Sequence, residues 1–355
     1  MEFRVFKQVS RVVFGRGAFT QLSDILEDFK EEGYVVFILD HVHKTSGIAD
    51  LLPSKKDDCI LYVDTSEEPK TQQIDVLRDD ILLTKLGDIP DLIVGIGGGS
   101  AMDIAKAVSV MLTNKGSSSE YQGWDLVKCK AIPKIAIPTL SGTGSEASRT
   151  AVLTGIDKKF GINSDQSMFD LVLMDPNLIS QVPKMQRFYS GMDCYIHCVE
   201  SIEGSFINAF GRAQAKVALG LCEKVFLNPK KDHNEDLMVA SYLGGASVAN
   251  SEVGVVHAMS YGLSLILGYH HGIANCIAFN QLDEFYPKYT PIFREMMEVD
   301  GIELPVGVTA NVTENQLEDM VNMTMKMERP LTSALGPDWK NILTKDKIRE
   351  LYLRM

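Results

Sequence analysis

Residues 91–106 read DLIVGIGGGSAMDIAK, and this stretch decides the fold. The apolar run from Leu92 to Ile96 predicts a buried strand, and the segment after Ser100 has the apolar spacing of a helix. The glycines between them let the backbone approach a ligand closely, while free amides and the positive end of the helix dipole attract a pyrophosphate. The stretch therefore predicts a nucleotide-binding strand-turn-helix unit, with a tight connection that binds no ligand as the alternative.

The candidate contacts in this turn are Gly97, Gly98, Gly99, Ser100 and Asp103. We expect Ser100 to be the N-cap of the helix and Asp103 to complete a capping box. Because position 100 is a serine, the spacing is not G-x-G-x-x-G, and the ordinary Rossmann fingerprint is absent.

A second turn of small residues, IPTLSGTGSE at 137–146, also follows an apolar run. The hydroxyl groups of Thr139, Ser141 and Thr143 can bind phosphate or ribose oxygens, or else form hydrogen bonds within the turn. Two such turns at consecutive strand ends lie where doubly wound sheets bind their ligands. The two turns indicate a dinucleotide more strongly than either turn does alone.

Asp40 closes the apolar run at 34–39. An acidic residue at such a strand end commonly accepts hydrogen bonds from the adenosine ribose of NAD and repels the additional phosphate of NADP. The basic residues that follow, His41, His43 and Lys44, leave some room for that phosphate, and an Asp after a strand is often only a turn former. We expect NAD as the cofactor.

The first half of the chain alternates short β-rich runs with helical patterns, which is typical of a parallel sheet covered by helices on both faces. The expected strands are 34–39, 59–63, 92–96, 134–138 and 171–174, and the expected helices are 19–29, 71–85 and 101–112. After about residue 180 only helical spacing remains, over 184–204, 208–226, 235–249, 252–267, 273–285 and 314–326. We expect a doubly wound, Rossmann-like α/β domain at 1–176 and an all-α domain at 177–355, because the turn-prone Asp175-Pro176-Asn177 lies where the pattern changes.

The histidines gather in the second half, where five of the seven fall between positions 197 and 271. Asp193 and His197 are four residues apart, so they share one face of a helix and can bind the same ion. With His257 and His271 they make one carboxylate and three imidazoles, a set suited to Fe²⁺ or Zn²⁺ with room for a substrate oxygen. For the Asp/His pair alone, the alternative is a surface ion pair or a hydrogen-bonded buried histidine.

The composition excludes several classes of partner. A formal net charge of −12 disfavours nucleic acid and anionic membranes. The six cysteines include no CxxC pair and fit a reducing compartment, although Cys194, Cys198 and Cys276 are possible soft metal ligands. The N-terminal MEFRVFK is not patterned as a signal peptide, and the apolar region 258–279 is broken by histidines and glycines. We expect a cytoplasmic protein.

The motifs are similar to those of the iron-containing (group III) alcohol dehydrogenases, a superfamily that also includes glycerol dehydrogenases and dehydroquinate synthase. The matching stretches are 97–106, 138–146, 175–176, 191–197 and 257–275, in the family's order. The resemblance implies a nucleotide domain followed by a helical metal-binding domain, with the active site in the cleft between them. It implies NAD and a divalent metal, Fe²⁺ or Zn²⁺, as cofactors.

Carried over by position, the resemblance makes Asp193, His197, His257 and His271 the metal ligands. It also places Asp40 at the ribose and makes nucleotide contacts of Gly97, Gly98, Ser100, Asp103, Thr139 and Thr143. The implied reaction is oxidation of a primary alcohol to an aldehyde, with hydride transfer to NAD. Within the family, the chain looks most like enzymes that oxidise the C8 hydroxyl of 3-deoxy-D-manno-octulosonate in lipopolysaccharide biosynthesis. The carboxylate of that sugar needs a cation, for which the candidates are Arg149, Lys159 and Arg187.

The chain departs from the family pattern at three places. Tyr261 replaces the usual histidine four residues after the third ligand, Lys70 replaces an asparagine near the cofactor, and the chain ends early. A tyrosine stays neutral where a histidine would titrate, so Tyr261 and His270 are the candidate catalytic residues, with His270 as a replacement proton carrier. Alternatively, Tyr261 only fills space on its helix.

Other functions remain open at this point. A small-alcohol or polyol dehydrogenase would use the same sites, and a dehydroquinate-synthase-like lyase would share the nucleotide turns but needs more phosphate-binding cations. A nicotinamide-binding sensor would share everything except turnover. The expected partners are a small alcohol or sugar acid and, as a possible homodimer, a second copy of the chain.

Overall fold

The computed structural model describes residues 7–29, 31–155 and 159–355. It contains two compact units, Met1–Gln181 and Val182–Met355, which we call the sheet unit and the helical unit. The predicted domain boundary between residues 176 and 177 stays a prediction. Residues 1–6, which carry most of the segment judged not to be a signal peptide, lie outside the described ranges.

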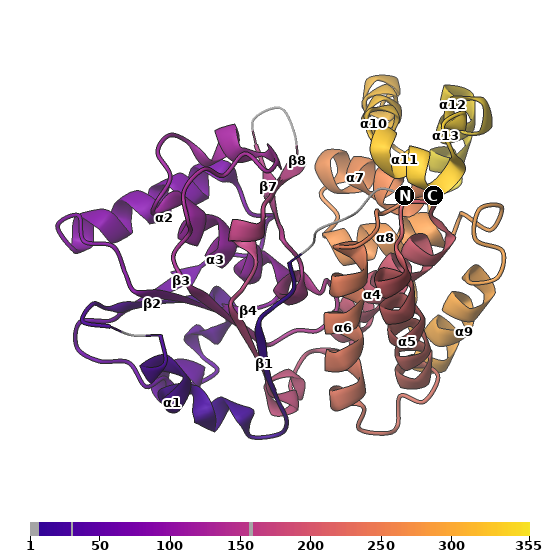
Figure 1. The fold of residues 1–355 in the computed structure, drawn as a ribbon. Coiled ribbons are helices and arrows are strands. Elements are labelled where there is room, and N and C mark those ends of the chain that lie inside the picture. The colour runs from indigo at the N-terminus through magenta and orange to yellow at the C-terminus, as the bar shows by residue number, and fades with distance from the viewer. Residues whose placement is uncertain (1–6, 30, 156–158) are drawn as a thin grey trace. The chain divides into compact units, whose positions relative to one another are not determined.

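The sheet unit is built on a parallel six-stranded sheet in the order β1-β9-β6-β4-β2-β3 (Figure 1). Its strands are β1 (Arg11–Phe14), β2 (Val35–Asp40), β3 (Cys59–Val63), β4 (Leu92–Gly97), β6 (Lys134–Pro138) and β9 (Leu171–Met174). Strands β2, β4, β6 and β9 are buried along their whole length, which is why they read as continuous apolar runs. The predicted doubly wound sheet is confirmed, and β1 is an additional, largely exposed strand that periodicity did not show.

Three helices of the sheet unit follow the predicted pattern. They are α1 (Leu22–Glu27), α2 (Thr71–Thr84) and α3 (Gly99–Met111), and a short 3-10 turn at 18–21 replaces the start of the first predicted helix. Helix α3 is buried from Ala101 to Met111 because it packs on β4 and β6 and also on β7. A helix buried all round is apolar all round, so its sequence has little polar face.

A second, three-stranded sheet was not expected from the sequence. Its strands are β5 (Gly123–Trp124), β7 (Thr150–Thr154) and β8 (Lys159–Asn163), in the order β5-β8-β7. Strands β7 and β8 pair antiparallel, and β7 alternates buried and half-buried residues over only five positions. Such short alternation is too brief to distinguish from a loop in the sequence.

The order of the main sheet determines where a ligand can bind. From β2 the chain passes outward to β3 at the edge, and then returns to β4 on the other side of β2. The order therefore reverses between β2 and β4, and open α/β sheets bind ligands at the carboxyl ends of the strands at such a point.

The helical unit packs its helices around α4 (Lys184–Glu203), which is buried from Ser190 to Ser201. Helices α5 (Ala209–Phe226), α6 (Asn234–Val248) and α8 (His271–Phe279) pack against it. The remaining helices are α7 (Val255–Leu267), α9 (Thr290–Asp300), α10 (Glu314–Lys326), α11 (Glu328–Leu335), α12 (Trp339–Ile342) and α13 (Lys345–Leu353) (Figure 1).

Close packing around α4 requires small residues. A Cβ at Gly191 would lie 2.2 Å from the Phe226 ring, and one at Gly244 would lie 2.7 Å from Cys194 Sγ. The predicted all-α character of this unit is confirmed, although α9, α11, α12 and α13 were not predicted. No helix within the described ranges is long and apolar enough to cross a bilayer.

Candidate functional site

Three predicted cofactor positions meet at the carboxyl ends of neighbouring strands in the sheet unit. Asp40 ends β2, Gly97 ends β4 and Thr139 follows β6, and β4 pairs with both of the other strands. The amide of Thr139 donates a hydrogen bond to the carbonyl oxygen of Gly97 over 2.9 Å. A Cβ at Gly97 would lie 2.8 Å from Asp40 Cβ, and the φ angle of +154° also requires glycine. The three residues are therefore assembled at the point where the strand order reverses.

Helix α3 begins earlier than the sequence predicted. Its N-cap is Gly98, which forms no side-chain cap, and Ser100 lies inside the first turn. The prediction of Ser100 as N-cap with Asp103 in a capping box is therefore wrong, because the glycine backbone itself starts the helix. Amides at a helix start without a side-chain cap can bind an anion.

Asp103 fastens α3 to the segment after the second turn. Its carboxylate accepts hydrogen bonds from Ser145 Oγ at 2.5 Å and the amide of Val152 at 3.1 Å, and lies 3.5 Å from Lys106 Nζ. Burial, opposed by Lys106, raises the pKa of Asp103, and burial lowers the pKa of Lys106. Both carboxylate oxygens thus have protein partners, and contact between Asp103 and the nucleotide stays a prediction.

The second turn, residues 139–145, lies against the start of α3. A Cβ at Gly99 would lie 2.6 Å from Thr143 Oγ1, which also accepts a hydrogen bond from the amide of Ser145. Thr139 Oγ1 lies 2.9 Å from His43 Nε2, and Ser141 is buried. The amides of the uncapped helix start, beside the hydroxyl groups of the second turn, are donors that suit a pyrophosphate.

Asp40 lies beside the loop after β3. Its carboxylate accepts hydrogen bonds from Thr65 Oγ1 at 2.9 Å and the amide of Val42 at 3.2 Å, and His41 Nδ1 lies 3.3 Å away. Burial, opposed by Asp40, lowers the pKa of His43, so this ring is neutral at pH 7. A neutral His43 gives no attraction for the additional phosphate of NADP.

The four predicted metal ligands meet inside the helical unit. Asp193 and His197 lie one turn apart on α4, His257 is the third residue of α7, and His271 is the first residue of α8. Helix α7 ends at Gly268, whose φ of +76° turns the chain back toward His257. One carboxylate oxygen and three ring nitrogens lie within 4.8 Å of one another.

The three rings converge on one oxygen, Asp193 Oδ1. The distances to it from Nε2 are 3.5 Å for His257, 3.6 Å for His271 and 3.9 Å for His197. Ligand atoms around a tetrahedral ion at about 2.1 Å lie roughly 3.4 Å apart, so this spacing fits a metal ion. The rings of His197 and His257 stack with centroids 4.6 Å apart.

Burial and charge in this cluster also favour a cation. Burial would raise the pKa of Asp193, but the surrounding imidazoles hold it well below its usual range. Burial also opposes a charge on His257, yet Glu200 and Asp193 raise the pKa of this ring to about 9. Among the described residues, Asp193 Oδ2 and His197 Nδ1 are buried without a hydrogen-bond partner. One oxygen and three nitrogen donors in a mostly buried cluster fit Fe²⁺ or Zn²⁺.

Glu200 belongs to this cluster, although the sequence did not single it out. It lies on α4, seven residues after Asp193 and three after His197, and is 2% exposed. Its Oε2 accepts a hydrogen bond from His257 Nδ1 at 2.5 Å. The spacing Asp-x3-His-x2-Glu puts all three on one face of the helix and is the signal that could have found it.

Asn275 lies among the same atoms. Its Nδ2 donates a hydrogen bond to Asp193 Oδ1 at 2.6 Å and lies 3.2 Å from Nε2 of both His257 and His271. An NH₂ group at this place would face a bound cation, so we expect the Asn275 amide to reorient when an ion binds.

The two candidate catalytic residues differ in position. Tyr261 is half-buried on α7, one turn after His257, with its ring centroid 6.2 Å from that of His271. His270 is exposed and precedes α8 as its N-cap residue. Tyr261 thus lies beside the cluster, and His270 adjoins it through the chain; their catalytic roles stay predictions.

The three candidate cations for a sugar carboxylate are each paired elsewhere. Arg149 lies 3.4 Å from Asp165 and also pairs with Asp125, and Lys159 lies 3.1 Å from Glu68. Arg187, on α4, donates a hydrogen bond to Asn234 Oδ1 at 2.7 Å.

The other departures from the family pattern have structural roles. Lys70 is the N-cap residue of α2 and pairs with Glu67. The last helix, α13, supplies Tyr352, whose hydroxyl donates a hydrogen bond to the Met259 carbonyl in α7 at 2.7 Å. The chain end therefore supports the helix that carries His257.

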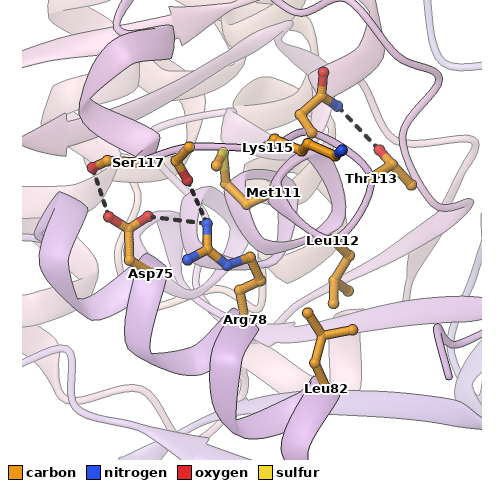
Figure 2. Close-up of a pocket in the computed structure, with 10 residues that line it drawn as sticks. Asp75, Arg78, Leu82, Met111, Leu112, Thr113, Lys115 and Ser117 are labelled. Atoms are coloured by element: carbon orange, nitrogen blue, oxygen red, sulfur yellow. Dashed lines mark hydrogen bonds and ion pairs between the residues drawn. The ribbon is translucent and has the colours of Figure 1, made fainter. Parts of the chain in front are cut away.

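A surface cavity of about 570 Å³ lies in the sheet unit between α2 and residues 111–117, apart from every predicted site residue (Figure 2). Figure 2 shows Arg78 beside Asp75, and the Arg78 guanidinium donates a hydrogen bond to the Gly116 carbonyl at 2.6 Å. Asp75 accepts hydrogen bonds from Ser117 Oγ and the amide of Ser118. These contacts fasten the loop after α3 to α2 and form no reactive group.

Comparison with known proteins agrees with both units. A family model described as iron-containing alcohol dehydrogenase matches residues 9–176, and one described as Fe-containing alcohol dehydrogenase family, C-terminal, matches 187–333. Long-chain-alcohol dehydrogenase 1 of Geobacillus thermodenitrificans is 30% identical, with 97% of this chain and 96% of the relative covered. Sulfoacetaldehyde reductase of Bilophila wadsworthia is 30% identical, over 75% and 70% of the two chains.

Solved structures share the fold. The crystal structure of sulfoacetaldehyde reductase from Bifidobacterium kashiwanohense in complex with NAD⁺ matches with a TM-score of 0.83 at 24% identity, over 100% of this chain and 99% of that one. A 1,3-propanediol oxidoreductase matches with a TM-score of 0.84 at 21% identity, over 98% and 100%. At these identities the likeness establishes the architecture.

Proposed function

The chain belongs to the iron-containing alcohol dehydrogenase family, and from this premise we propose that it interconverts a primary alcohol and its aldehyde with NAD. The observation that carries the proposal is the buried cluster of Asp193, His197, His257 and His271. An alcohol oxidoreductase needs an electrophile at the substrate oxygen and a hydride carrier at the carbon, and the two units hold candidate sites for each.

When bound, the metal supplies a Lewis acid that polarises the substrate oxygen, and the nicotinamide accepts the hydride. Asp193 is the one anionic residue of the proposed ligand set, and the three imidazoles bind in their neutral form, so the ion and its four ligands carry a net positive charge that the adjacent Glu200 carboxylate balances. His271 has 24% of its side chain exposed, whereas the other three ligands are nearly inaccessible. The substrate oxygen therefore approaches the cluster from the side of His271.

We propose iron as the native metal. The four donors are one oxygen and three nitrogens, and no thiolate belongs to the set among the described residues. Imidazole and carboxylate ligands suit Fe²⁺ as well as Zn²⁺, so the family membership decides the preference. Cys194, considered as a soft ligand, instead donates its thiol proton to the Ala240 carbonyl.

The nucleotide is proposed to bind in the sheet unit. Gly97 to Gly99 provide a backbone that a pyrophosphate can approach, and Asp40 lies at the neighbouring strand end, where a ribose hydroxyl would meet its carboxylate. The NAD⁺ complex of the structural neighbour named above supports the same cofactor for this chain.

We propose a class of substrate and, within it, one specific candidate. A small primary alcohol or polyol needs nothing beyond the cluster and the cofactor. The C8 hydroxyl of 3-deoxy-D-manno-octulosonate is the finer candidate, and it rests on overall sequence likeness, because Arg149, Lys159 and Arg187 are all paired with other groups. The printed names of relatives span long-chain alcohols, sulfoacetaldehyde and 1,3-propanediol, so they do not select one substrate.

The test combines metal analysis with a turnover assay. Protein reconstituted anaerobically with Fe²⁺ or Zn²⁺ is given NAD and a panel of primary alcohols, polyols and 3-deoxy-D-manno-octulosonate, and NADH formation is followed by absorbance. We expect about one bound ion per chain and turnover that a chelator abolishes. NAD binding without NADH formation on any alcohol would instead support the sensor. A lyase is disfavoured because both matched family models describe alcohol dehydrogenases. The possible homodimer stays a proposal that light scattering can measure.

A further inference from the structure

We propose that Glu200 is a positioning residue of the metal centre, which holds the His257 ring so that its Nε2 lone pair faces the ion. The inference rests on the proposed function, since it concerns the same cluster. Glu200 does not belong to the four-residue ligand set, and it acts through a ligand, not on the substrate.

The two oxygens of the Glu200 carboxylate have different partners. Oε2 accepts one short hydrogen bond, from His257 Nδ1 at 2.5 Å. Oε1 faces the amide of Val256 at 2.7 Å, the amide of His257 at 3.4 Å and the Tyr286 hydroxyl at 3.4 Å. Oε2 therefore binds the His257 ring, whereas Oε1 binds the backbone that carries this ring.

The backbone contacts place Glu200 at the start of α7. The N-cap residue, Gly254, forms no side-chain cap of its own, so the Glu200 carboxylate takes the place of one. A Cβ at Gly254 would lie 3.0 Å from Glu200 Oε1 and 2.8 Å from the Tyr286 hydroxyl. The glycine thus allows the carboxylate to reach the first amides of the helix, and His257 is held at both its backbone and its ring.

The hydrogen bond to Oε2 selects one form of the ring. A carboxylate only accepts hydrogen bonds, so His257 Nδ1 must carry a proton. In a neutral imidazole the other nitrogen, Nε2, then carries the lone pair. This Nε2 is the atom that lies 3.5 Å from Asp193 Oδ1 and faces the other proposed ligands. Carboxylates that bind ligating histidines in this way orient the ring and strengthen it as a donor.

Glu200→Gln gives a sharp test, because the amide has one acceptor and one donor end. The three donors around Oε1 require the amide oxygen there, so the NH₂ group has to face His257 Nδ1. That group donates, and therefore favours the ring with its proton on Nε2, which blocks metal binding. Glu200→Gln thus preserves the hydrogen bonds at the start of α7 but favours the His257 tautomer that cannot bind a metal through Nε2.

The experiment measures Co²⁺ binding to the metal-free full chain by competition with a chelator, together with the Co²⁺ absorption spectrum. We expect Glu200→Gln to bind Co²⁺ about 10- to 100-fold more weakly than the unmodified chain, with an altered spectrum. The matched control is Glu252→Gln, since Glu252 is a mostly buried acid near the start of α7 that pairs with Arg329 and not with a ligand. This control should bind Co²⁺ as the unmodified chain does.

The outcomes separate the two proposals. Unchanged affinity and spectrum in Glu200→Gln would overturn the role of Glu200 and leave the metal-dependent function intact. An unmodified chain that binds no metal would overturn both. If the variant does not fold, NMR of the Zn²⁺-loaded chain decides: a His257 Nδ1 proton shifted far downfield, as a short hydrogen bond to Glu200 requires, supports the inference, and a shift equal to that of the other ligating imidazoles overturns it.

Discussion

In the sheet unit the candidate site is made largely of backbone, with Gly97 and the uncapped start of α3 presenting amides. In the helical unit the candidate site is made of side chains, which three helices bring to within 4.8 Å of one another. The site in the sheet unit requires glycine, because a Cβ at Gly97 would clash with Asp40 and one at Gly99 would clash with Thr143. The site in the helical unit requires particular side chains, because each ligand residue supplies one donor atom.

The difference predicts how each unit responds to change. Removing a ligand side chain from the helical unit should directly lower metal content and turnover. Removing a side chain from the site in the sheet unit should mainly change the preference between NAD and NADP. Both units also enclose charged side chains. The sheet unit buries Lys134 along with Asp103, Lys106 and Asp175, and the helical unit buries the carboxylates of Asp193 and Glu200.

The largest effect is expected from the ligands. His271→Ala removes one of four donors, and we expect metal content to fall and kcat/KM to drop by about 10³-fold, because several kcal/mol of Lewis-acid stabilisation are lost. Metal analysis and the NADH assay measure both quantities. His233→Ala is the control, since His233 is a buried histidine of the same unit that pairs with Asp236.

Alanine variants of Asp193, His197 and His257 should behave like the His271 variant. If all four variants keep their full metal content, the ligand assignment is wrong and the comparison between the two units loses its basis.

The second effect is on stability and its pH dependence. Burial lowers the pKa of Lys134 from 10.5 to about 8. The unfolded chain therefore binds more protons between pH 8 and 10.5, and the sheet unit gains stability as the pH rises through that window. Lys134→Met should stabilise the unit at pH 7 by up to about 3 kcal/mol and remove the rise. Amide hydrogen exchange in the sheet unit measures this.

The metal-free helical unit should show the opposite sign. Glu200 and Asp193 raise the pKa of His257 from 6.5 to about 9. The stability that the charged His257 ring contributes is therefore complete below pH 6.5 and is lost as the pH rises through 9. Hydrogen exchange that changes in the same direction in both units would contradict this contrast.

The third effect concerns the nucleotide. Asp40→Gly removes a carboxylate at the expected ribose position, and we expect the preference for NAD over NADP to narrow by roughly tenfold. The ratio of kcat/KM values for the two cofactors is the measurement. Thr65→Val is the control, because it removes a hydrogen bond to Asp40 without removing the charge. Equal use of both cofactors by the unmodified chain would refute the role of Asp40.

The smallest effect is expected at Tyr261. If its ring only packs beside His271, Tyr261→Phe should change kcat by less than about fivefold, the value of one ordinary hydrogen bond. Tyr261→His should add a limb near neutral pH to the rate profile. A single histidine-like limb in the unmodified chain that disappears in His270→Ala would show that His270 moves the proton instead.

The sequence predicted those parts whose signal is local. Buried strands such as β2 and β4 are continuous apolar runs. Asp40 and Gly97 end these two neighbouring parallel strands, so the sequence places both residues at the same edge of the sheet. The Asp193 and His197 pair is visible because one helix carries both. The meeting of His257 and His271 with that pair came from family resemblance, since no local pattern joins three helices.

The remaining features could not be predicted from the sequence, because they depend on contacts with residues far away in the chain. Ser100 has the chemistry of an N-cap, yet the N-cap of α3 is Gly98, and Gly99 packs so closely on Thr143 that no side chain fits there. Strands β7 and β8 depend on pairing with each other, and β7 also packs on α3, so their own sequences carry little signal. Glu200 reads as an ordinary helix acid until α7 brings His257 to it.

The position of Asn275 has a consequence for metal exchange. The side chain is fully buried, and its hydrogen bond to Asp193 Oδ1 must break before an ion can reach that oxygen. Uptake and release of an ion would then both require this packed amide to rotate. We expect a chain that takes up iron slowly and, once loaded, keeps it through long exposure to a chelator, whereas Asn275→Ala should exchange its metal much faster at similar affinity.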